Sequence, residues 1–299
     1  MSALALALAA AATTQAPARP TFSTAVEAVY VDVFVSDGNR PVIGLSAADF
    51  ELRDDGRRQA VELVAVESLP LTTFLVLDTS ASVKGEKLAQ LQAAVRTLLH
   101  GLRPADETAL LTFDHEVRMP VAPTHDVQRL TAVVDGVLPG GSTALFDALY
   151  AGTMLASGRG RALLVLFTDG EDNMSWLDAA EVRRVLEESN VLVQAVGVVP
   201  TEESRVHLDG WSPTPETPHA RLLRQLAEVT GGRFWPAASP DKLDDAFLAI
   251  LAAMKTRYVL RFEPQRGKRE GRHELHVKLV RRKGKVHCRK AYFVGPAPP

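Results

Sequence analysis

Carboxylate and hydroxyl side chains stand next to strongly apolar segments at three places in this chain. Asp78-Thr79-Ser80-Ala81-Ser82 begins at the end of one apolar run, and Thr168-Asp169-Gly170 directly follows another. Gly140-Gly141-Ser142-Thr143 precedes a segment with helical spacing. Together they offer two carboxylates and at least three hydroxyls, an oxygen-rich set that suits Mg²⁺, Mn²⁺ or Ca²⁺ and not zinc. The pattern predicts a site for one divalent ion if the three groups meet.

The segments between these groups predict a fold in which they do meet. Nearly continuous apolar runs, typical of strands buried on both faces, alternate with segments of helical spacing. Strands are expected at 73–78, 106–113, 161–167 and 191–199, with a short edge strand at 233–235, and helices at 85–101, 126–137, 144–157, 178–189, 219–230 and 240–255. Such alternation implies right-handed crossovers and a mostly parallel sheet. Ligands bind at the carboxyl ends of such strands, where all three groups are expected.

The segments on either side of this core are β-rich. Residues 21–69 contain alternating runs at 26–35, 50–53 and 59–67, and Asp54-Asp55-Gly56 is expected to close a hairpin. Residues 256–299 contain further strand signals, at 258–262, 274–280 and 286–294. We expect the two flanks to pack together as one small sandwich-like unit, with the core of residues 70–255 inserted between them. Segment 201–218 carries three prolines and is expected to be an exposed loop.

Here the sequence resembles a known family. The order and spacing of Asp78-x-Ser80-x-Ser82, Thr143 and Asp169 are similar to the metal-ion-dependent adhesion site of von Willebrand factor type A domains, which have a Rossmann-like α/β fold. More loosely, the flanks resemble those of secreted bacterial proteins with this domain. The resemblance implies that Ser80, Ser82 and Thr143 supply hydroxyl ligands, and that Asp78 and Asp169 bind directly or through water. It also implies that a partner's Glu or Asp commonly supplies the last ligand.

Each proposed ligand also has a simpler structural role that could explain it without a metal. Asp78, Ser80 and Thr143 each precede a helix and suit capping, and Asp169-Gly170 suits a turn. Four further residues are expected to support the site rather than to bind the metal: Asp114, Gly141, Asp147 and Gly170. Asp172 is expected to be a solvated or supporting residue.

Composition and charge exclude several classes of function. Hydrophobic residues make up 46% and charged residues 23%, which is ordinary for a soluble globular protein. The formal net charge of -2 provides no basic field for nucleic acid. The basic stretch from Arg257 to Lys290 is interpreted as a solvated sheet face, with a weak polyanion or envelope contact as the alternative. Cys288 is the only cysteine, so no intrachain disulfide forms, and we interpret it as a packing residue.

Residues 1–20 resemble a secretory leader followed by a linker. A short Ala/Leu run precedes small residues, although the usual cationic start is missing. The run is too short to span a bilayer, and no other stretch is long enough. We therefore expect a secreted, periplasmic or cell-envelope protein. The alternative is an Ala-rich extension on a cytoplasmic one.

The favoured hypothesis is a metal-dependent protein-binding or adhesion module. No nucleophile–base pattern and no phosphate-binding loop is evident, so we expect no enzyme. One alternative is an intracellular assembly partner of an AAA ATPase, and a less favoured one is a metal-assisted hydrolase. In a further alternative the metal site is vestigial and binding runs through the β flanks.

Overall fold

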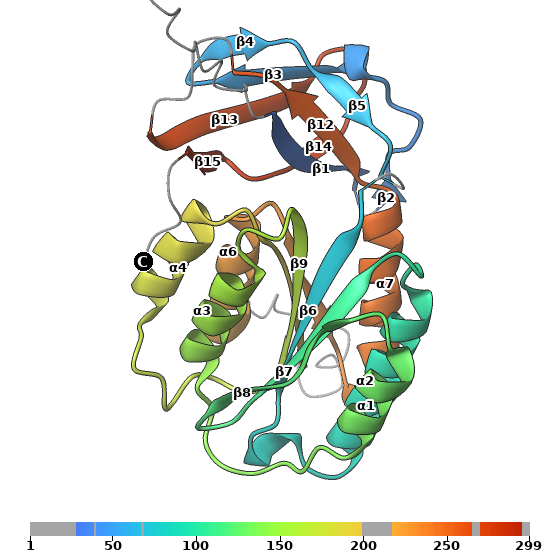
Figure 1. The fold of residues 1–299 in the computed structure, drawn as a ribbon, viewed down its shortest axis with the longest axis vertical. Helices are drawn as coiled ribbons and strands as arrows, with labels where there is room; N and C mark the ends of the chain where they lie inside the picture. Colours follow the sequence, from blue (N-terminus) through green and yellow to red (C-terminus); the bar gives the residue numbers. More distant parts are fainter. Residues whose placement is uncertain (1–27, 39, 67–68, 199–216, 265–269, 295–299) are drawn as a thin grey trace, which may run out of the picture.

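The computed structural model describes residues 28–38, 40–66, 69–198, 217–264 and 270–294. The predicted leader (1–20) and most of the predicted loop (201–218) lie outside the described residues. The described part forms an α/β unit with a smaller β unit stacked on one end of it (Figure 1). No described helix is long and apolar enough to cross a membrane.

A six-stranded sheet forms the centre of the α/β unit. Its order is β11-β10-β9-β6-β7-β8, and every pair is parallel except the antiparallel edge pair β7–β8. The bounds are β6 Leu71–Asp78, β7 Glu107–Phe113, β8 Val117–Thr124, β9 Arg161–Thr168, β10 Leu192–Val198 and β11 Arg233–Ala237. All eight residues of β6 are buried, as its apolar sequence predicts for a strand covered on both faces. The expected mostly parallel sheet is confirmed.

Helices cover both faces of this sheet (Figure 1). Helices α1 (Glu86–Gly101), α2 (Val127–Asp135) and α7 (Leu243–Lys255) pack against one face in a shared apolar cluster. Helices α3 (Leu145–Ala156), α4 (Ala179–Glu188) and α6 (Pro218–Glu228) pack against the other. Alternate residues of β6 enter the two clusters: Leu75 and Leu77 face the first, and Phe74 and Val76 face the second. The two-sided burial fixes the strand register, and with it the position of Asp78 at the strand end.

The β-rich flanks pack together as expected. A five-stranded sheet has the order β14-β1-β12-β5 with β2 beside β1, and a four-stranded sheet has the order β15-β13-β3-β4. The bounds are β1 Val29–Asp37, β2 Arg40–Pro41, β3 Phe50–Asp54, β4 Arg57–Gln59, β5 Glu62–Val64, β12 Tyr258–Phe262, β13 Gly271–Leu279, β14 Lys285–His287 and β15 Ala291–Val294. N-terminal β1 pairs with C-terminal β12, and N-terminal β3 pairs with C-terminal β13. One apolar cluster joins the two sheets.

Two sequence predictions in the strands were wrong, and one strand was missed. Residues 286–294 form two strands in different sheets, β14 and β15, separated where Arg289 contacts Asn190 of the α/β unit. The expected strand 59–67 is likewise divided between β4 and β5. Edge strand β8 was not predicted: only Val121 is buried along it, and two prolines interrupt its sequence.

Buried charges join the β unit to the α/β unit. Asp32 on β1 lies 2.9 Å from Arg161 of β9 and 3.5 Å from Arg257. Arg257 also donates to the carbonyl oxygen of Gly231 at 3.0 Å, and Arg289 donates to that of Ser189 at 3.2 Å. Arg257 and Arg289 are buried, so the prediction that the basic stretch 257–290 is a solvated face is wrong at these two residues.

Candidate functional site

Backbone hydrogen bonds tie together the loops that carry the predicted metal ligands. The amide of Gly140 donates to the carbonyl oxygen of Thr79 at 2.8 Å, and that of Ala81 donates to the carbonyl oxygen of Gly141 at 3.0 Å. Thr143 and Asn173 exchange a further pair: the Asn173 amide donates to the Thr143 carbonyl oxygen, and Asn173 Oδ1 accepts from the Thr143 amide at 2.9 Å. The structure therefore brings the three polar groups to one edge of the sheet.

The side chains themselves converge. Ser80 Oγ and Ser82 Oγ lie 2.9 Å apart, and Ser82 Oγ donates to Asp169 Oδ1 at 2.7 Å. A Cβ at Gly170 would lie 3.7 Å from both Ser82 Oγ and Thr143 Oγ1, so these two hydroxyls lie near the same position. Hydroxyl and carboxylate oxygens from three separate segments thus surround one point.

Asp78 lies beneath this point rather than in it. Its side chain is buried, and its two oxygens accept from the Ser80 amide at 2.9 Å and from Thr168 Oγ1 at 2.7 Å. Burial raises the pKa of Asp78 above its ordinary value, although the hydrogen bonds from Ser80 and Thr168 oppose that rise. Asp78 therefore orients Ser80 by hydrogen bonding. Thr168 was not singled out from the sequence, where it appears only as the last residue of a buried strand.

Lys87 is a second neighbour that sequence reasoning missed. Its Nζ lies 2.5 Å from Asp169 Oδ2, and the Asp169 side chain is only 1% exposed. Lys87 stands in the first turn of α1, so the helix that follows the Asp78–Ser82 segment places a cation at the far carboxylate. Asp169 consequently shares its charge between Ser82 and Lys87.

The predicted supporting residues have distinct partners. Asp114 accepts from the Glu116 amide at 2.8 Å and pairs with Arg118 at 3.0 Å. Burial alone would raise the pKa of Asp114, but these contacts hold it below its ordinary value. Asp147 accepts from the amides of Trp176 and Leu177, both at 3.1 Å.

Two more predicted neighbours act on the loops. Asp172 Oδ1 accepts from Ser175 Oγ at 2.5 Å and lies 3.3 Å from the Phe146 amide. Gly141 has φ +76°, a backbone conformation that favours glycine. Asp147 and Asp172 thus organise the 171–177 loop, and Gly141 allows the turn beside Ser80.

The surface around the converging oxygens is hollowed and partly apolar. A depression of about 450 Å³ is lined by residues of all three loops, among them Ser80, Ser82 and Thr143. On adjoining loop segments Trp176 is 96% exposed and Leu138 is 86% exposed. Exposed large apolar side chains beside a polar depression are typical of surfaces that bind other molecules.

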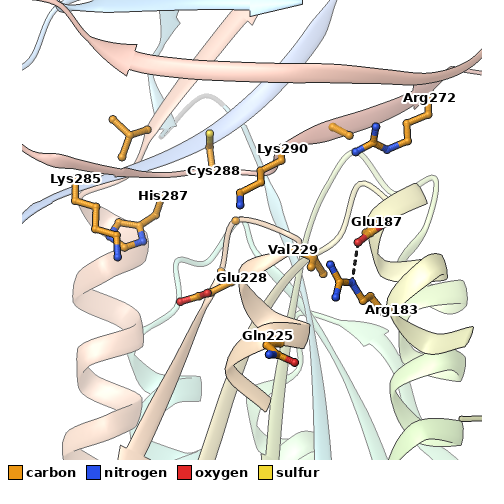
Figure 2. A pocket seen from close by; sticks show the side chains of 14 residues that line it. Arg183, Glu187, Gln225, Glu228, Val229, Arg272, Lys285, His287, Cys288 and Lys290 are labelled. Carbon is orange, nitrogen blue, oxygen red and sulfur yellow. Dashed lines mark hydrogen bonds and ion pairs between the residues drawn. The ribbon is translucent and has the colours of Figure 1, made fainter. Parts of the chain in front are cut away.

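A second hollow lies at the junction between the two units (Figure 2). This cleft of about 550 Å³ is lined by the side chains of Lys285, Lys290 and Arg272 from the β unit and by Arg183 of α4, which pairs with Glu187 at 2.9 Å. Cys288 also lines it, and burial raises the pKa of its thiol to about 11, which agrees with the packing role expected for it.

One more group of potential metal ligands lies in the β unit. Asp54, Asp55 and His273 place one ligand atom each within 4.8 Å of one another. In the sequence, Asp54 and Asp55 lie in a predicted hairpin turn and His273 lies in the basic stretch, and no local pattern connects them. The residues are about 220 positions apart, so only the pairing of β3 with β13 brings them together.

Comparisons with known proteins agree with the α/β fold. Residues 73–171 match the model of the von Willebrand factor type A domain family. The inter-alpha-trypsin inhibitor heavy chain H2 of Sus scrofa is 22% identical over 151 residues, which are 45% of this chain and 16% of that protein. The corresponding mouse protein is 23% identical over 150 residues. The match therefore spans about a sixth of these relatives' length.

Solved structures of other proteins share the fold. A von Willebrand factor type A protein from Catenulispora acidiphila aligns over 89% of this chain and 74% of its own, with a TM-score of 0.50 and 12% identity. Proximal thread matrix protein 1 from the mussel byssus aligns over 73% of this chain and 51% of its own, with a TM-score of 0.51 and 15% identity. At these identities the likeness concerns the fold alone. Fold and loop pattern define an α/β domain with a polar site at the carboxyl ends of its strands. Within this domain, residues 73–171 are the part of the chain that matches the von Willebrand factor type A domain family.

Proposed function

We propose that this domain binds one divalent cation, Mg²⁺ in the first place, and uses it to bind a carboxylate of a partner protein. Ser80, Ser82 and Thr143 are the proposed hydroxyl ligands, Asp169 binds directly or through water, and Asp78 acts by holding Ser80. The observation that carries the proposal is the convergence of three oxygen atoms. Ser82 Oγ lies 2.9 Å from Ser80 Oγ and 2.7 Å from Asp169 Oδ1.

The donor set fits a hard cation. All the proposed ligand atoms are hydroxyl or carboxylate oxygens, and the set contains neither imidazole nor thiolate. Only Asp78 and Asp169 bring negative charge, and Lys87 neutralises part of it. An ion held by so few charges stays electron-poor, which favours binding of a further anionic oxygen from outside the chain.

The surrounding surface supports a protein partner. Trp176 is exposed, yet its amide is fixed by Asp147, so the side chain is presented from an ordered loop. Tryptophan is enriched among the residues that dominate binding energy at interfaces. The cation supplies the polar anchor, and the loops around it supply apolar contact and specificity.

A carboxylate probe tests the metal's proposed role. Full-length protein is loaded with Mn²⁺, and water-proton relaxation reports the water molecules on the ion while excess acetate is added. We expect acetate to displace bound water and to lower the relaxation enhancement, whereas chloride at equal ionic strength leaves it unchanged. A bound ion whose relaxation enhancement ignores acetate would contradict carboxylate capture.

The same proposal places this binding outside the cell, because the predicted leader supports export. The alternative is assembly with an AAA ATPase inside the cell. N-terminal sequencing of the protein from fractionated cells separates the two, since export requires the chain to be found beyond the cytoplasmic membrane. Catalysis is not part of the proposal.

A further inference from the structure

The turn between β3 and β4 is fastened to β13 in the four-stranded sheet of the β unit. The Asp55 amide donates to the Glu274 carbonyl oxygen at 2.9 Å, and the Glu274 amide donates back to Asp55 Oδ1 at 2.9 Å. Asp54 stands opposite Leu275 in the register, next to His273. The position of the two carboxylates relative to the imidazole is therefore set by the backbone.

Each carboxylate uses one oxygen for the protein and directs the other at His273. Asp55 Oδ1 accepts from Glu274, while Asp55 Oδ2 lies 3.1 Å from His273 Nδ1. Asp54 Oδ2 accepts from the Tyr292 hydroxyl at 3.1 Å, while Asp54 Oδ1 lies 3.3 Å from the same nitrogen. Two carboxylate oxygens and one imidazole nitrogen thus face one another.

Asp54 Oδ1 is the ligand atom whose hydrogen bonding is incomplete. No residue in the described part of the chain donates a hydrogen bond to it, although the Asp54 side chain is only 8% exposed. A buried carboxylate oxygen left in this way is costly. A protonated His273 satisfies it poorly, because 3.3 Å exceeds the ~2.8 Å of a charge-assisted hydrogen bond.

The spacing suits a shared metal ion better. Ligand atoms about 2.1 Å from one ion lie roughly 3.0 to 3.4 Å apart when their bonds meet at octahedral or tetrahedral angles. The two oxygen–nitrogen distances, 3.1 and 3.3 Å, fall in that range. One ion among Asp54, Asp55 and His273 is compatible with these two distances, and the three ligand atoms all lie within 4.8 Å of one another.

Neighbouring groups hold the ligands in place. The His273 and Tyr292 rings stack with centroids 4.9 Å apart, which fixes the imidazole plane. The Tyr292 hydroxyl also donates to Asp54 Oδ2, which fixes the orientation of that carboxylate. Such outer hydrogen bonds orient ligands and are typical of built metal sites.

We infer that Asp54, Asp55 and His273 bind a divalent ion of the zinc class, distinct from the oxygen-only site of the α/β unit. One imidazole and two carboxylates suit Zn²⁺ and the neighbouring transition metals better than Mg²⁺ or Ca²⁺. The Asp55 side chain is half-exposed, so the site opens to solvent there and water completes the coordination. Because the ion links the β3–β4 turn to β13, it stabilises the β unit.

The test uses full-length protein stripped with chelator, dialysed, and titrated with ZnCl₂ in a calorimeter. Asp55→Asn keeps the oxygen that accepts from Glu274 but removes the charge, and His273→Gln removes the imidazole. His276→Gln, on an exposed position of the same strand, is the matched control. We expect one zinc site that weakens at least tenfold in Asp55→Asn and His273→Gln and is unchanged in His276→Gln.

The variant Asp78→Ala distinguishes zinc binding at Asp54, Asp55 and His273 from metal binding at the oxygen-only site of the α/β unit. Zinc binding that persists in Asp78→Ala and is lost in Asp55→Asn supports the inference, whatever the fate of the oxygen-only site. Unchanged zinc affinity in both Asp55→Asn and His273→Gln, or no binding by the wild type, overturns it. If His273→Gln fails to fold, Asp55→Asn, whose fold is checked by circular dichroism, decides alone.

Discussion

Lys87 Nζ lies 2.5 Å from Asp169 Oδ2, while the other oxygen of the same carboxylate, Oδ1, accepts from Ser82. The two contacts divide the charge of one buried carboxylate between a lysine and the proposed metal site. A cation beside Ser82 and the Lys87 ammonium therefore repel each other and draw on the same negative charge.

Removing this lysine is expected to strengthen metal binding. In Lys87→Met the ammonium is lost and the aliphatic stem is kept, so Mn²⁺ affinity should rise by roughly two- to fivefold, the range expected for a partly exposed charge pair. Lys84→Met, at an exposed lysine three residues earlier, should change affinity little. Calorimetric titration measures both. Weaker binding in Lys87→Met would mean that Lys87 organises the site instead of competing with the ion.

Asp147 is expected to act on the loop and not on the metal. In Asp147→Ala the amides of Trp176 and Leu177 lose their acceptor, so both should exchange with solvent at least tenfold faster in hydrogen-exchange measurements. Mn²⁺ affinity should stay within about twofold of wild type. A loss of metal binding as large as that of Ser80→Ala would place Asp147 among the ligands.

Asp32 is expected to make the junction sensitive to acid. Burial alone would raise its pKa, but Arg161 and Arg257 hold the pKa below its ordinary value of 3.8. The carboxylate therefore contributes its full stability above pH ~4 and loses that contribution as the pH falls through the lowered pKa. Asp32→Asn, which leaves Arg257 buried without a counter-charge, should cost about 3 kcal/mol at neutral pH.

Urea unfolding of wild type and Asp32→Asn across the pH range checks both parts of that expectation. The difference in unfolding free energy should be constant from neutral pH to about pH 5 and should shrink only below about pH 4. A difference that is already small at neutral pH would show that the two arginines find other partners.

Gly231 is expected to be intolerant of any side chain. It has φ +82°, and a Cβ there would lie 2.5 Å from the Arg289 amide nitrogen and 2.6 Å from the Cys288 carbonyl carbon. Both are backbone atoms of the β unit, so neither can move aside cheaply. Gly231→Ala should lower the unfolding free energy by at least about 2 kcal/mol. Gly158→Ala is the control. Gly158 has a similar φ but no atom close to a Cβ, so this variant measures the cost of the backbone conformation without the steric clash.

Local patterns predicted most of the α/β unit, because its strands are short apolar runs and its helices are strongly periodic. The Asp78, Thr143 and Asp169 segments were placed together because parallel strands end at one edge. Lys87 and Thr168 escaped notice since a helical lysine and a strand threonine are ordinary in sequence. That the assembled residues bind a metal stays a prediction.

Features that depend on pairing between distant segments were not predicted. Asp54 and His273 meet only through the register of β3 and β13, which no local pattern specifies. Alternation of apolar residues continued through Arg289, so nothing in the sequence showed that this residue leaves its strand to contact Asn190. Buried Arg257 and Arg289 were interpreted as solvated because charge runs usually are, and their partner Asp32 lies on the other flank.

The most direct test of the central claim is an electron paramagnetic resonance titration of Mn²⁺ into full-length wild type, Ser80→Ala and Ser142→Ala. Ser142 lines the same depression but is outside the proposed ligand set, which makes it the matched control. We predict saturable binding in wild type and Ser142→Ala, and at least tenfold weaker binding in Ser80→Ala with its thermal unfolding unchanged. Equal binding in all three proteins, or none in the wild type, would contradict a cation held by Ser80, Ser82, Thr143 and Asp169.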